Sequence, residues 1–162
     1  FNFGELLTSI SKEIHENGDF NWKYLSYFIQ EAPGTRNLHV ITNSGNVADP
    51  YEYLHSPSFN ILIKKLKEQY NWVLLDAPPV MAVPDTITIG SYTDGALVIT
   101  GIDTTLSMLR KVRKMFSNHH IPIFGVIARD IQVSESLSTN EYMKQMISRM
   151  IPQDDDALVK KQ

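Results

Sequence analysis

The stretch Trp72-Val73-Leu74-Leu75-Asp76-Ala77-Pro78-Pro79 decides the fold that this sequence predicts. Four consecutive apolar residues without polar alternation are typical of a β-strand covered on both faces, as in the parallel sheets of α/β proteins. The two prolines that follow cannot continue a β-ladder, because proline lacks the backbone N–H that the ladder needs. We therefore predict a strand over residues 72–76 that delivers Asp76 to the carboxyl edge of a sheet.

The position predicted for Asp76 suits nucleotide chemistry. Ligands of open α/β sheets bind at the carboxyl ends of the strands. Mg²⁺ usually takes only one or two protein carboxylates beside its waters and the phosphates of a substrate. Asp76 is therefore a candidate catalytic and metal-binding residue. The alternative is a buried strand whose last residue only begins a turn, since Asp is also common in turns.

The remaining pattern predicts further strands and helices. Strands are expected near residues 38–42, 95–100 and 122–127, which are short, apolar and bounded by turn residues. Amphipathic helices are expected at 4–16, from about 21, from Ser56-Pro57, after Asp103-Thr104-Thr105 and after Thr139 or Asn140, with Asp85 capping a short one. A turn-rich loop is expected at 43–50. This order predicts a single α/β domain over residues 1–162, with three layers and a mostly parallel sheet.

The composition excludes several classes of function. The chain has 162 residues, of which 43% are hydrophobic and 20% charged, as in a globular domain. Its net charge of −3 gives no basic excess for binding phosphates, so we predict no nucleic-acid partner. The absence of cysteine excludes disulfides and thiolate metal sites and is compatible with a cytoplasmic location. No apolar run approaches the roughly 20 residues that span a bilayer.

One helix face is strongly basic. Arg110, Lys111, Arg113 and Lys114 lie together on the outer face of the helix expected after Thr105. A cluster of this kind is usually a solvated face, and contact with acidic lipids or an acidic partner is the alternative.

Three stretches carry a resemblance to a known family. The hydrophobic run with Asp76-Ala-Pro-Pro resembles the Walker B segment of the MinD/ParA group of P-loop ATPases, and the same segment occurs in bacterial tyrosine kinases. Residues 1–7, Phe-Asn-Phe-Gly-Glu-Leu-Leu, resemble the stretch that follows the second acidic motif in the CpaE/TadZ branch of localisation and pilus-assembly ATPases. Residues 150–154, Met-Ile-Pro-Gln-Asp, resemble the strand and Pro-x-Asp loop beside the nucleotide base. The resemblance implies a P-loop NTPase-like fold.

The resemblance also implies which residues meet the nucleotide. Asp76 would position Mg²⁺ and the water near the γ-phosphate of ATP, and Pro152 and Asp154 would lie near the base. Arg129 stands where the family has an asparagine that recognises adenine. An arginine can stack on a base or meet a phosphate, but it does not offer the paired donor and acceptor of an amide. Arg129, Pro152 and Asp154 are thus the candidate cofactor-binding residues.

The phosphate-binding loop of the family, Gly-x-x-x-x-Gly-Lys-Ser/Thr, is absent from this sequence. In the family the loop precedes the acidic motif, which would place it upstream of Phe1. The sequence therefore resembles the middle and end of an ATPase domain, with ATP bound through an upstream P-loop. A relative that naturally lacks the loop is the alternative.

The resemblance predicts an ATPase of the MinD/ParA/CpaE kind, in which ATP controls homodimerisation and the positioning of a cell-surface or pilus-assembly apparatus. It implies a cytoplasmic protein with a protein or membrane-surface partner at the inner membrane face. One alternative is a bacterial tyrosine kinase domain of polysaccharide export, supported by Asp76-Ala-Pro-Pro-Val80 and Gly125-Val126-Ile127. The region after Arg129 holds only Tyr142, which counts against the tyrosine cluster of such kinases. A degenerate non-catalytic scaffold is the other alternative, favoured by the lost asparagine.

Overall fold

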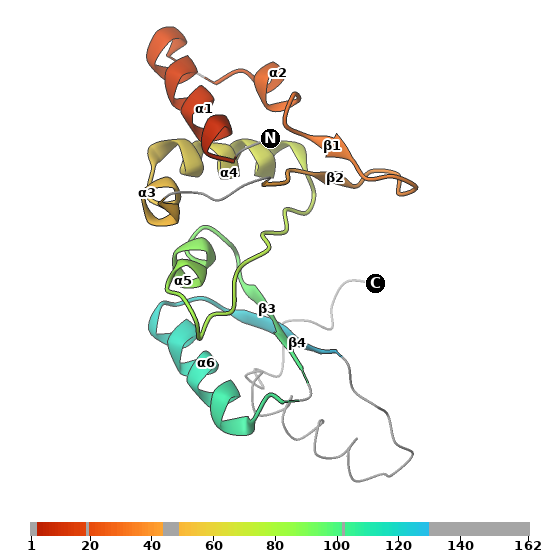
Figure 1. Cartoon of the computed structure of the whole chain (residues 1–162), viewed down its shortest axis with the longest axis vertical. Coiled ribbons are helices and arrows are strands. Elements are labelled where there is room, and N and C mark those ends of the chain that lie inside the picture. Colours follow the sequence, from red (N-terminus) through yellow and green to blue (C-terminus); the bar gives the residue numbers. More distant parts are fainter. Residues whose placement is uncertain (1–2, 19, 44–48, 102, 130–162) are drawn as a thin grey trace, which may run out of the picture. The chain divides into compact units, whose positions relative to one another are not determined.

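The computed structural model describes residues 3–18, 20–43, 49–101 and 103–129 (Figure 1). The chain divides into two compact units, Phe1–Ala77 and Pro78–Gln162, and each is described by itself. Both helices and small sheets occur, so the architecture is mixed α/β. The prediction of one domain over the whole chain stays a prediction.

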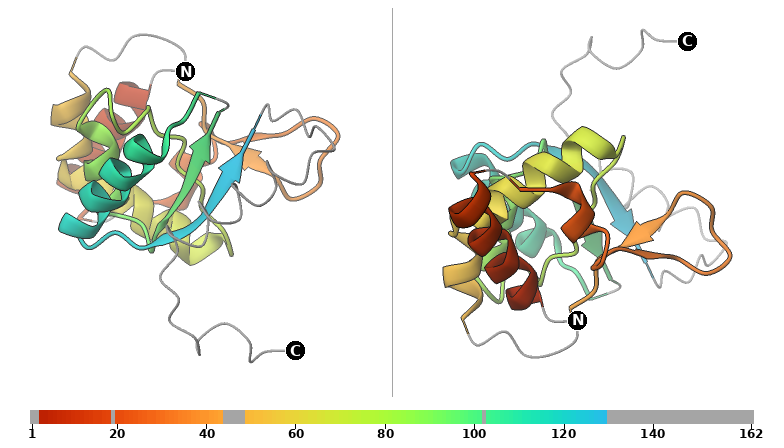
Figure 2. Two further views of the ribbon diagram at one scale, coloured as in Figure 1. Left: turned by 90° about the horizontal axis from the view of Figure 1, so that it is seen from below. Right: turned by 90° about the horizontal axis from the view of Figure 1, so that it is seen from above.

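Two amphipathic helices, α1 and α4, form the centre of the first unit. The helices of this unit are α1 (Phe3–Asn17), α2 (Trp22–Leu25), α3 (Pro50–Leu54) and α4 (Pro57–Gln69), and its strands are β1 (Gln30–Glu31) and β2 (His39–Val40). Helices α1 and α4 lie in contact (Figure 2). The buried side chains are apolar: Leu6, Leu7, Ile10, Phe20, Leu25, Phe59, Leu62, Ile63 and Leu66. The helical spacing that predicts α1 and α4 is confirmed.

Capping residues explain where the helices of this unit begin. The Ser56 side chain accepts a hydrogen bond from the Phe59 N–H at 3.2 Å, and Pro57 occupies the first turn of α4, as predicted. Helix α3 is not among the predicted elements, although Asp49-Pro50 gives the same signal. The Asp49 side chain accepts from the Glu52 N–H at 3.2 Å. The last two residues of the loop expected at 43–50 are therefore the N-cap and the first residue of a helix.

The strand expected near 38–42 is shorter than predicted and antiparallel. Strand β2 covers only His39–Val40 and pairs with β1 in the register Gln30↔Val40 and Glu31↔His39. Asn37, at a positive φ of 64°, lies in the connection before β2. Since Leu38 and Val40 are both exposed, this hairpin has no covered apolar face, which a strand of a parallel sheet requires.

The strand predicted at 72–76 is also absent from the structure. Residues 72–79 are described but belong to no strand or helix. Trp72 and Leu74 are 84% and 81% exposed and alternate with half-buried Val73 and Leu75. An apolar run favours a strand, but a strand exists only where a neighbouring strand accepts its hydrogen bonds, and no described strand does so here. The prediction that Asp76 ends a strand at residues 72–76 is therefore wrong.

The second unit is built around a pair of parallel strands. Its elements are α5 (Asp85–Gly90), β3 (Ala96–Thr100), α6 (Leu106–Asn118) and β4 (Ile123–Ala128). Strands β3 and β4 pair in parallel, from Leu97↔Gly125 to Thr100↔Ala128, which confirms both predicted strands. The cap predicted for Asp85 is wrong, because Pro84 precedes α5 without a side-chain hydrogen bond. Asp85 lies instead in the first turn, where a carboxylate suits the helix dipole.

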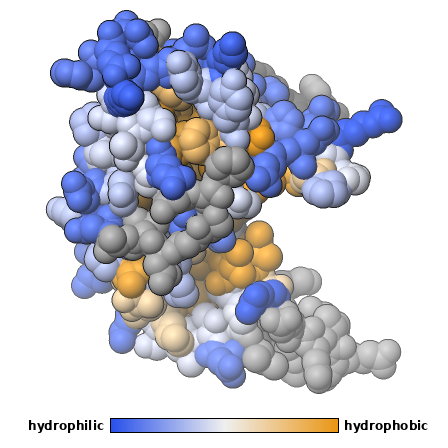
Figure 3. Space-filling model, turned by 45° about the horizontal axis from the view of Figure 1, so that its top comes forward, coloured by the Kyte–Doolittle hydropathy of each residue, from blue (hydrophilic) through white to orange (hydrophobic). Residues whose placement is uncertain are grey.

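The core of the second unit covers one face of the β3–β4 pair. Leu109, Val112 and Phe116 of α6 are buried, and they pack with the apolar residues Val80, Ile87, Ala96, Val98, Leu106, Ile121, Ile123 and Val126. In this unit Leu97, Ile99, Phe124 and Ile127 are 52%, 65%, 61% and 48% exposed, and apolar surface is visible in the lower half of Figure 3. The described part of the unit thus does not confirm the predicted three-layer arrangement.

A tight contact between α5 and Ile121 leads to a first prediction. A Cβ atom at Gly90 would meet Ile121 Cδ1 at 2.6 Å, and Ile121 is only 5% exposed. Gly90→Ala should therefore destabilise the protein by about 1–3 kcal/mol, the usual cost of overpacking, less the gain in helix propensity. In an Ile121→Val background, which lacks Cδ1, the same change should cost less. Urea unfolding of the four proteins measures the coupling.

Gly101→Ala is the matched control for this cycle, because no neighbouring heavy atom lies within 4 Å of its Cβ position. If Gly90→Ala lowered the free energy of unfolding equally in both backgrounds, the predicted clash with Ile121 would be contradicted.

Tyr70 connects α4 with the hairpin of the first unit. As the C-cap residue of α4 it places its hydroxyl 2.6 Å from His39 Nδ1, and its ring lies 5.5 Å from the His39 ring and 6.1 Å from the Trp22 ring. Burial raises the pKa of the Tyr70 phenol from its usual value of 10.0, because the anion loses hydration.

A second prediction follows from this shift. Because the folded state disfavours the phenolate, the free energy of unfolding should fall as the pH rises from about 10 through the pKa of folded Tyr70. Tyr70→Phe should be less stable at pH 8 by about 0.5–1.5 kcal/mol, since it loses one hydrogen bond, but its deficit should shrink above pH 10. Urea unfolding followed by fluorescence measures both. Tyr27→Phe, at an exposed position, is the control. A deficit that stays constant with pH would contradict the prediction.

Candidate functional site

The carboxyl edge of the β3–β4 pair is the part of the second unit best placed to bind a ligand. Thr100, the last residue of β3, is 5% exposed, and Arg129 follows directly after β4. The Arg129 N–H donates to the Thr100 carbonyl at 2.9 Å, so the two strand ends are held together. Ligands of open α/β sheets bind at such an edge. Arg129 is exposed at this edge, and a guanidinium is a group that can bind a phosphate or stack on a base.

The turn between β3 and α6 lies next to this edge and is closed by a threonine. Thr104 Oγ1 accepts from the Gly101 N–H at 3.0 Å, and the Thr104 N–H donates to the Gly101 carbonyl at 3.1 Å. Thr105 then caps α6, because its hydroxyl oxygen accepts from the Met108 N–H at 3.2 Å. The cap predicted at Asp103-Thr104-Thr105 is confirmed and falls on Thr105. The role of Thr104 is not predicted from sequence, because any small polar residue fits the same pattern.

Asp76 lies on an extended segment at the end of the first unit and is exposed. The residues after it are held more firmly: Thr86 Oγ1 donates to the Pro78 carbonyl at 2.6 Å, and the Ala82 N–H donates to the Pro79 carbonyl at 2.8 Å. No local pattern indicates the Thr86–Pro78 bond, which links positions eight residues apart. Its effect is to fix the double proline against α5. The catalytic and metal-binding role of Asp76 stays a prediction.

The other candidate residues lie partly outside the described chain. Pro152 and Asp154 are among the residues that the structure does not describe, and the role of Arg129 toward a base stays a prediction. Among the described residues no group of three or more His, Cys, Asp or Glu side chains could hold a metal ion.

No described helix is both long enough and apolar enough to cross a membrane.

The class of protein that this chain resembles emerges from comparison with known proteins. Its homologues are bacterial tyrosine-protein kinases. No family model matches the chain.

Three relatives illustrate the similarity. The chain is 36% identical over 107 residues to the tyrosine-protein kinase ptk of Acinetobacter johnsonii, which covers 65% of this chain and 14% of that kinase. It is 31% identical over 80 residues to the putative tyrosine-protein kinase EpsB of Ralstonia nicotianae, covering 49% and 11% of the two chains. The tyrosine-protein kinase CpsD of Streptococcus pneumoniae is 22% identical over 99 residues, covering 60% and 44%. The chain thus spans less than half the length of each relative.

The matched stretch includes Asp76. Because 65% of 162 residues is about 105 residues, any such stretch contains residues 58–105 wherever it begins. The stretch aligned with the Acinetobacter kinase therefore spans residues 74–79, β3 and the Thr104 turn.

The comparisons correct the function predicted from the sequence. The prediction of a positioning ATPase of the MinD/ParA/CpaE kind is wrong, because the relatives found are tyrosine-protein kinases. The alternative of a bacterial tyrosine kinase fits them better. Residues 1–7 and the missing tyrosines after Arg129 favoured the positioning ATPase, but neither feature belongs to the nucleotide chemistry around Asp76.

A third prediction is that this chain alone does not bind ATP with micromolar affinity. Most of the attraction for phosphates in a P-loop site comes from converging backbone N–H groups, a lysine and a helix N-terminus, and this sequence lacks the loop that combines them. Asp76 repels the triphosphate unless Mg²⁺ intervenes. Calorimetry with ATP and Mg²⁺ should show no saturable heat. A dissociation constant of about 10 μM or less, some −7 kcal/mol, would contradict the prediction.

Proposed function

We propose that this chain is part of the catalytic domain of a bacterial tyrosine kinase. The observation that carries the proposal is the 36% identity to the Acinetobacter kinase across a stretch that contains Asp76. The reaction is transfer of the γ-phosphoryl group of ATP to the hydroxyl of a tyrosine, which yields ADP and phosphotyrosine and releases the phenolic proton. Regulation of polysaccharide export is the process that we assign to it, and a cytoplasmic location follows from the use of ATP.

Asp76 has the central role in this proposal. Phosphoryl transfer depends on positioning and on neutralising the charge of the phosphates, with little covalent work for the protein. Mg²⁺, when bound with ATP, supplies that neutralisation. The Asp76 carboxylate would hold the ion through its waters, and its exposure leaves room for them. The phosphates would have to be bound by groups outside this sequence, because it contains no Gly-x-x-x-x-Gly-Lys loop.

Arg129 would act at the nucleotide from the carboxyl edge of β3–β4. Its backbone is fixed by the bond to Thr100, while its guanidinium is exposed and can stack on the base or meet a phosphate. Further elements covering the open apolar face of β3–β4 would complete a three-layer P-loop NTPase-like domain, which is the finer fold that we propose.

A fourth prediction tests this function in a chimera. The matching stretch of this chain replaces its counterpart in the Acinetobacter kinase, which supplies the remaining parts of the domain. The chimera should transfer phosphate from ATP to tyrosine, and Asp76→Asn should reduce the rate by at least about 100-fold, because charge stabilisation at a phosphoryl centre is worth orders of magnitude in rate. Labelled phosphate on tyrosine measures the rate.

Glu68→Gln is the matched control, because it also removes one negative charge from an exposed side chain within the matched stretch. Glu68 is 60% exposed, and its ion pair with Lys65, at 3.6 Å, is of a kind that contributes little to stability. Both variants should keep the melting temperature of the chimera. A folded chimera in which Asp76→Asn and Glu68→Gln have equal activity would overturn the role of Asp76.

A non-catalytic scaffold is a second candidate function, and one residue favours it. Arg129 replaces the amide that would recognise adenine, which weakens selection of ATP. A scaffold predicts that the folded chimera lacks kinase activity even with Asp76 intact, so the same experiment separates the two functions.

A further inference from the structure

The second unit contains a stretch of chain without acidic residues. From Thr104 to Arg129 there is no Asp or Glu, although the whole chain has 18 acidic residues and a net charge of −3. The same stretch holds five of the 15 Lys and Arg residues: Arg110, Lys111, Arg113, Lys114 and Arg129. This stretch of sequence is therefore positively charged in a chain that is negative as a whole.

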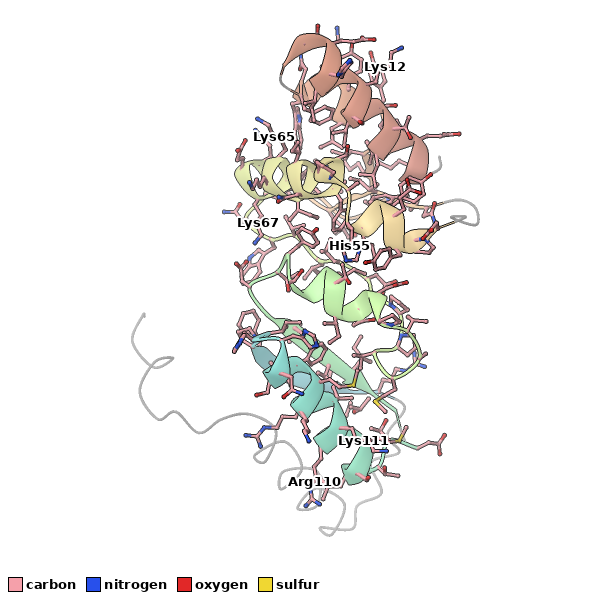
Figure 4. The ribbon with its side chains drawn as sticks, turned by 90° about the vertical axis from the view of Figure 1, so that its left-hand side faces the viewer. Lys12, His55, Lys65, Lys67, Arg110 and Lys111 are labelled. Carbon is pink, nitrogen blue, oxygen red and sulfur yellow. The ribbon has the colours of Figure 1, made fainter. Side chains whose placement is uncertain are left out.

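Helix α6 carries four of these charges, and three of them lie on its outer side. Its inner face is defined by the buried residues Leu109, Val112 and Phe116, which pack on the sheet. With 3.6 residues per turn, Arg110, Lys111 and Lys114 lie opposite that face, and all three side chains are exposed. Figure 4 shows Arg110 and Lys111 on α6. We call these three residues the basic face of α6.

The basic face is not neutralised within the described part of the chain, where none of its three cations forms an ion pair. Lys12 and Lys65, on the first unit, differ in this respect because each pairs with a glutamate on its own helix. Arg110 and Lys114 are four residues apart, and Lys111 and Lys114 three, so like charges face each other and destabilise the helix. The negative charges of a bound anionic surface would attract these cations and offset the repulsion between them.

We propose that the basic face of α6 binds the anionic surface of a lipid bilayer. Each Lys or Arg near such a surface is attracted to acidic head groups. The net charge of −3 does not prevent this, because salt screens charges beyond about 8 Å, so the local field decides.

Lipid fits the basic face better than an acidic polypeptide does. The three cations are long side chains on a convex helix, and no ion pair with a described residue fixes them. Their positive charge is therefore concentrated in one region, but the positions of the charged groups are not fixed. Lipid head groups are mobile and can arrange themselves around such a surface, whereas an acidic segment of protein would have to be ordered on it at a cost in entropy. The inference does not depend on kinase activity.

The fifth prediction tests the proposal by sedimentation of the full chain with vesicles. The chain should bind vesicles of phosphatidylcholine mixed with phosphatidylglycerol, should not bind phosphatidylcholine alone, and should be released by high salt. Arg110→Gln, Lys111→Gln and Lys114→Gln together should weaken binding about 100-fold, from roughly 1 kcal/mol for each cation removed.

The matched control removes three cations from the first unit by changing Lys12, Lys65 and Lys67 to Gln, which alters the net charge equally (Figure 4). This variant should bind vesicles like the unchanged chain, and circular dichroism should show both variants folded. Equal loss in the two variants, or binding that persists without acidic lipid, would overturn the proposal. Binding of the chain to soluble polyglutamate but not to vesicles would overturn it in favour of an acidic protein partner.

Discussion

The parallel pairing of β3 with β4 is the interaction on which the second unit depends. Parallel strands cannot be joined by a tight turn, so a connection long enough to return the chain to the start of the sheet is required. Helix α6 provides it, and its buried residues Leu109, Val112 and Phe116 cover one face of the pair. The same connection brings the Thr104 turn and Arg129 to one edge. The candidate ligand edge and the outward basic face are thus two results of one packing requirement.

Much of the local structure could be predicted from the sequence, because local signals determine it. Helices α1, α4 and α6 follow from apolar spacing, and Ser56 and Thr105 cap two of them through their own hydroxyl oxygens. Strands β3 and β4 follow from short apolar runs bounded by turns. Helix α3 has an equally local signal in Asp49-Pro50, although the same two residues are also typical of a turn.

The errors occur where structure depends on distant partners. The run at 72–76 has the composition of a buried strand, but strand formation needs a neighbour, and no local pattern specifies whether one is present. The hairpin of β1 and β2 is antiparallel because of chain reversal before His39, which the β-branched residues after it do not reveal. For the site, Arg129 and the Thr105 cap were predictable by position, while the hydrogen bonds of Thr86 and Thr104 were not. The tyrosine kinase function that we propose was predicted only as an alternative, because the Asp76 segment is common to both protein groups.

The exposed apolar face of the β3–β4 pair has a consequence for the tendency of the chain to aggregate. Neither strand contains a charged residue or a proline, which are the usual devices that keep an exposed strand from pairing with another chain. Phe124 and Ile99 add exposed apolar side chains to this surface. Two nascent copies that meet through such strands can assemble into an aggregate. Burial of these side chains against another polypeptide surface would remove this route to aggregation for the described strands.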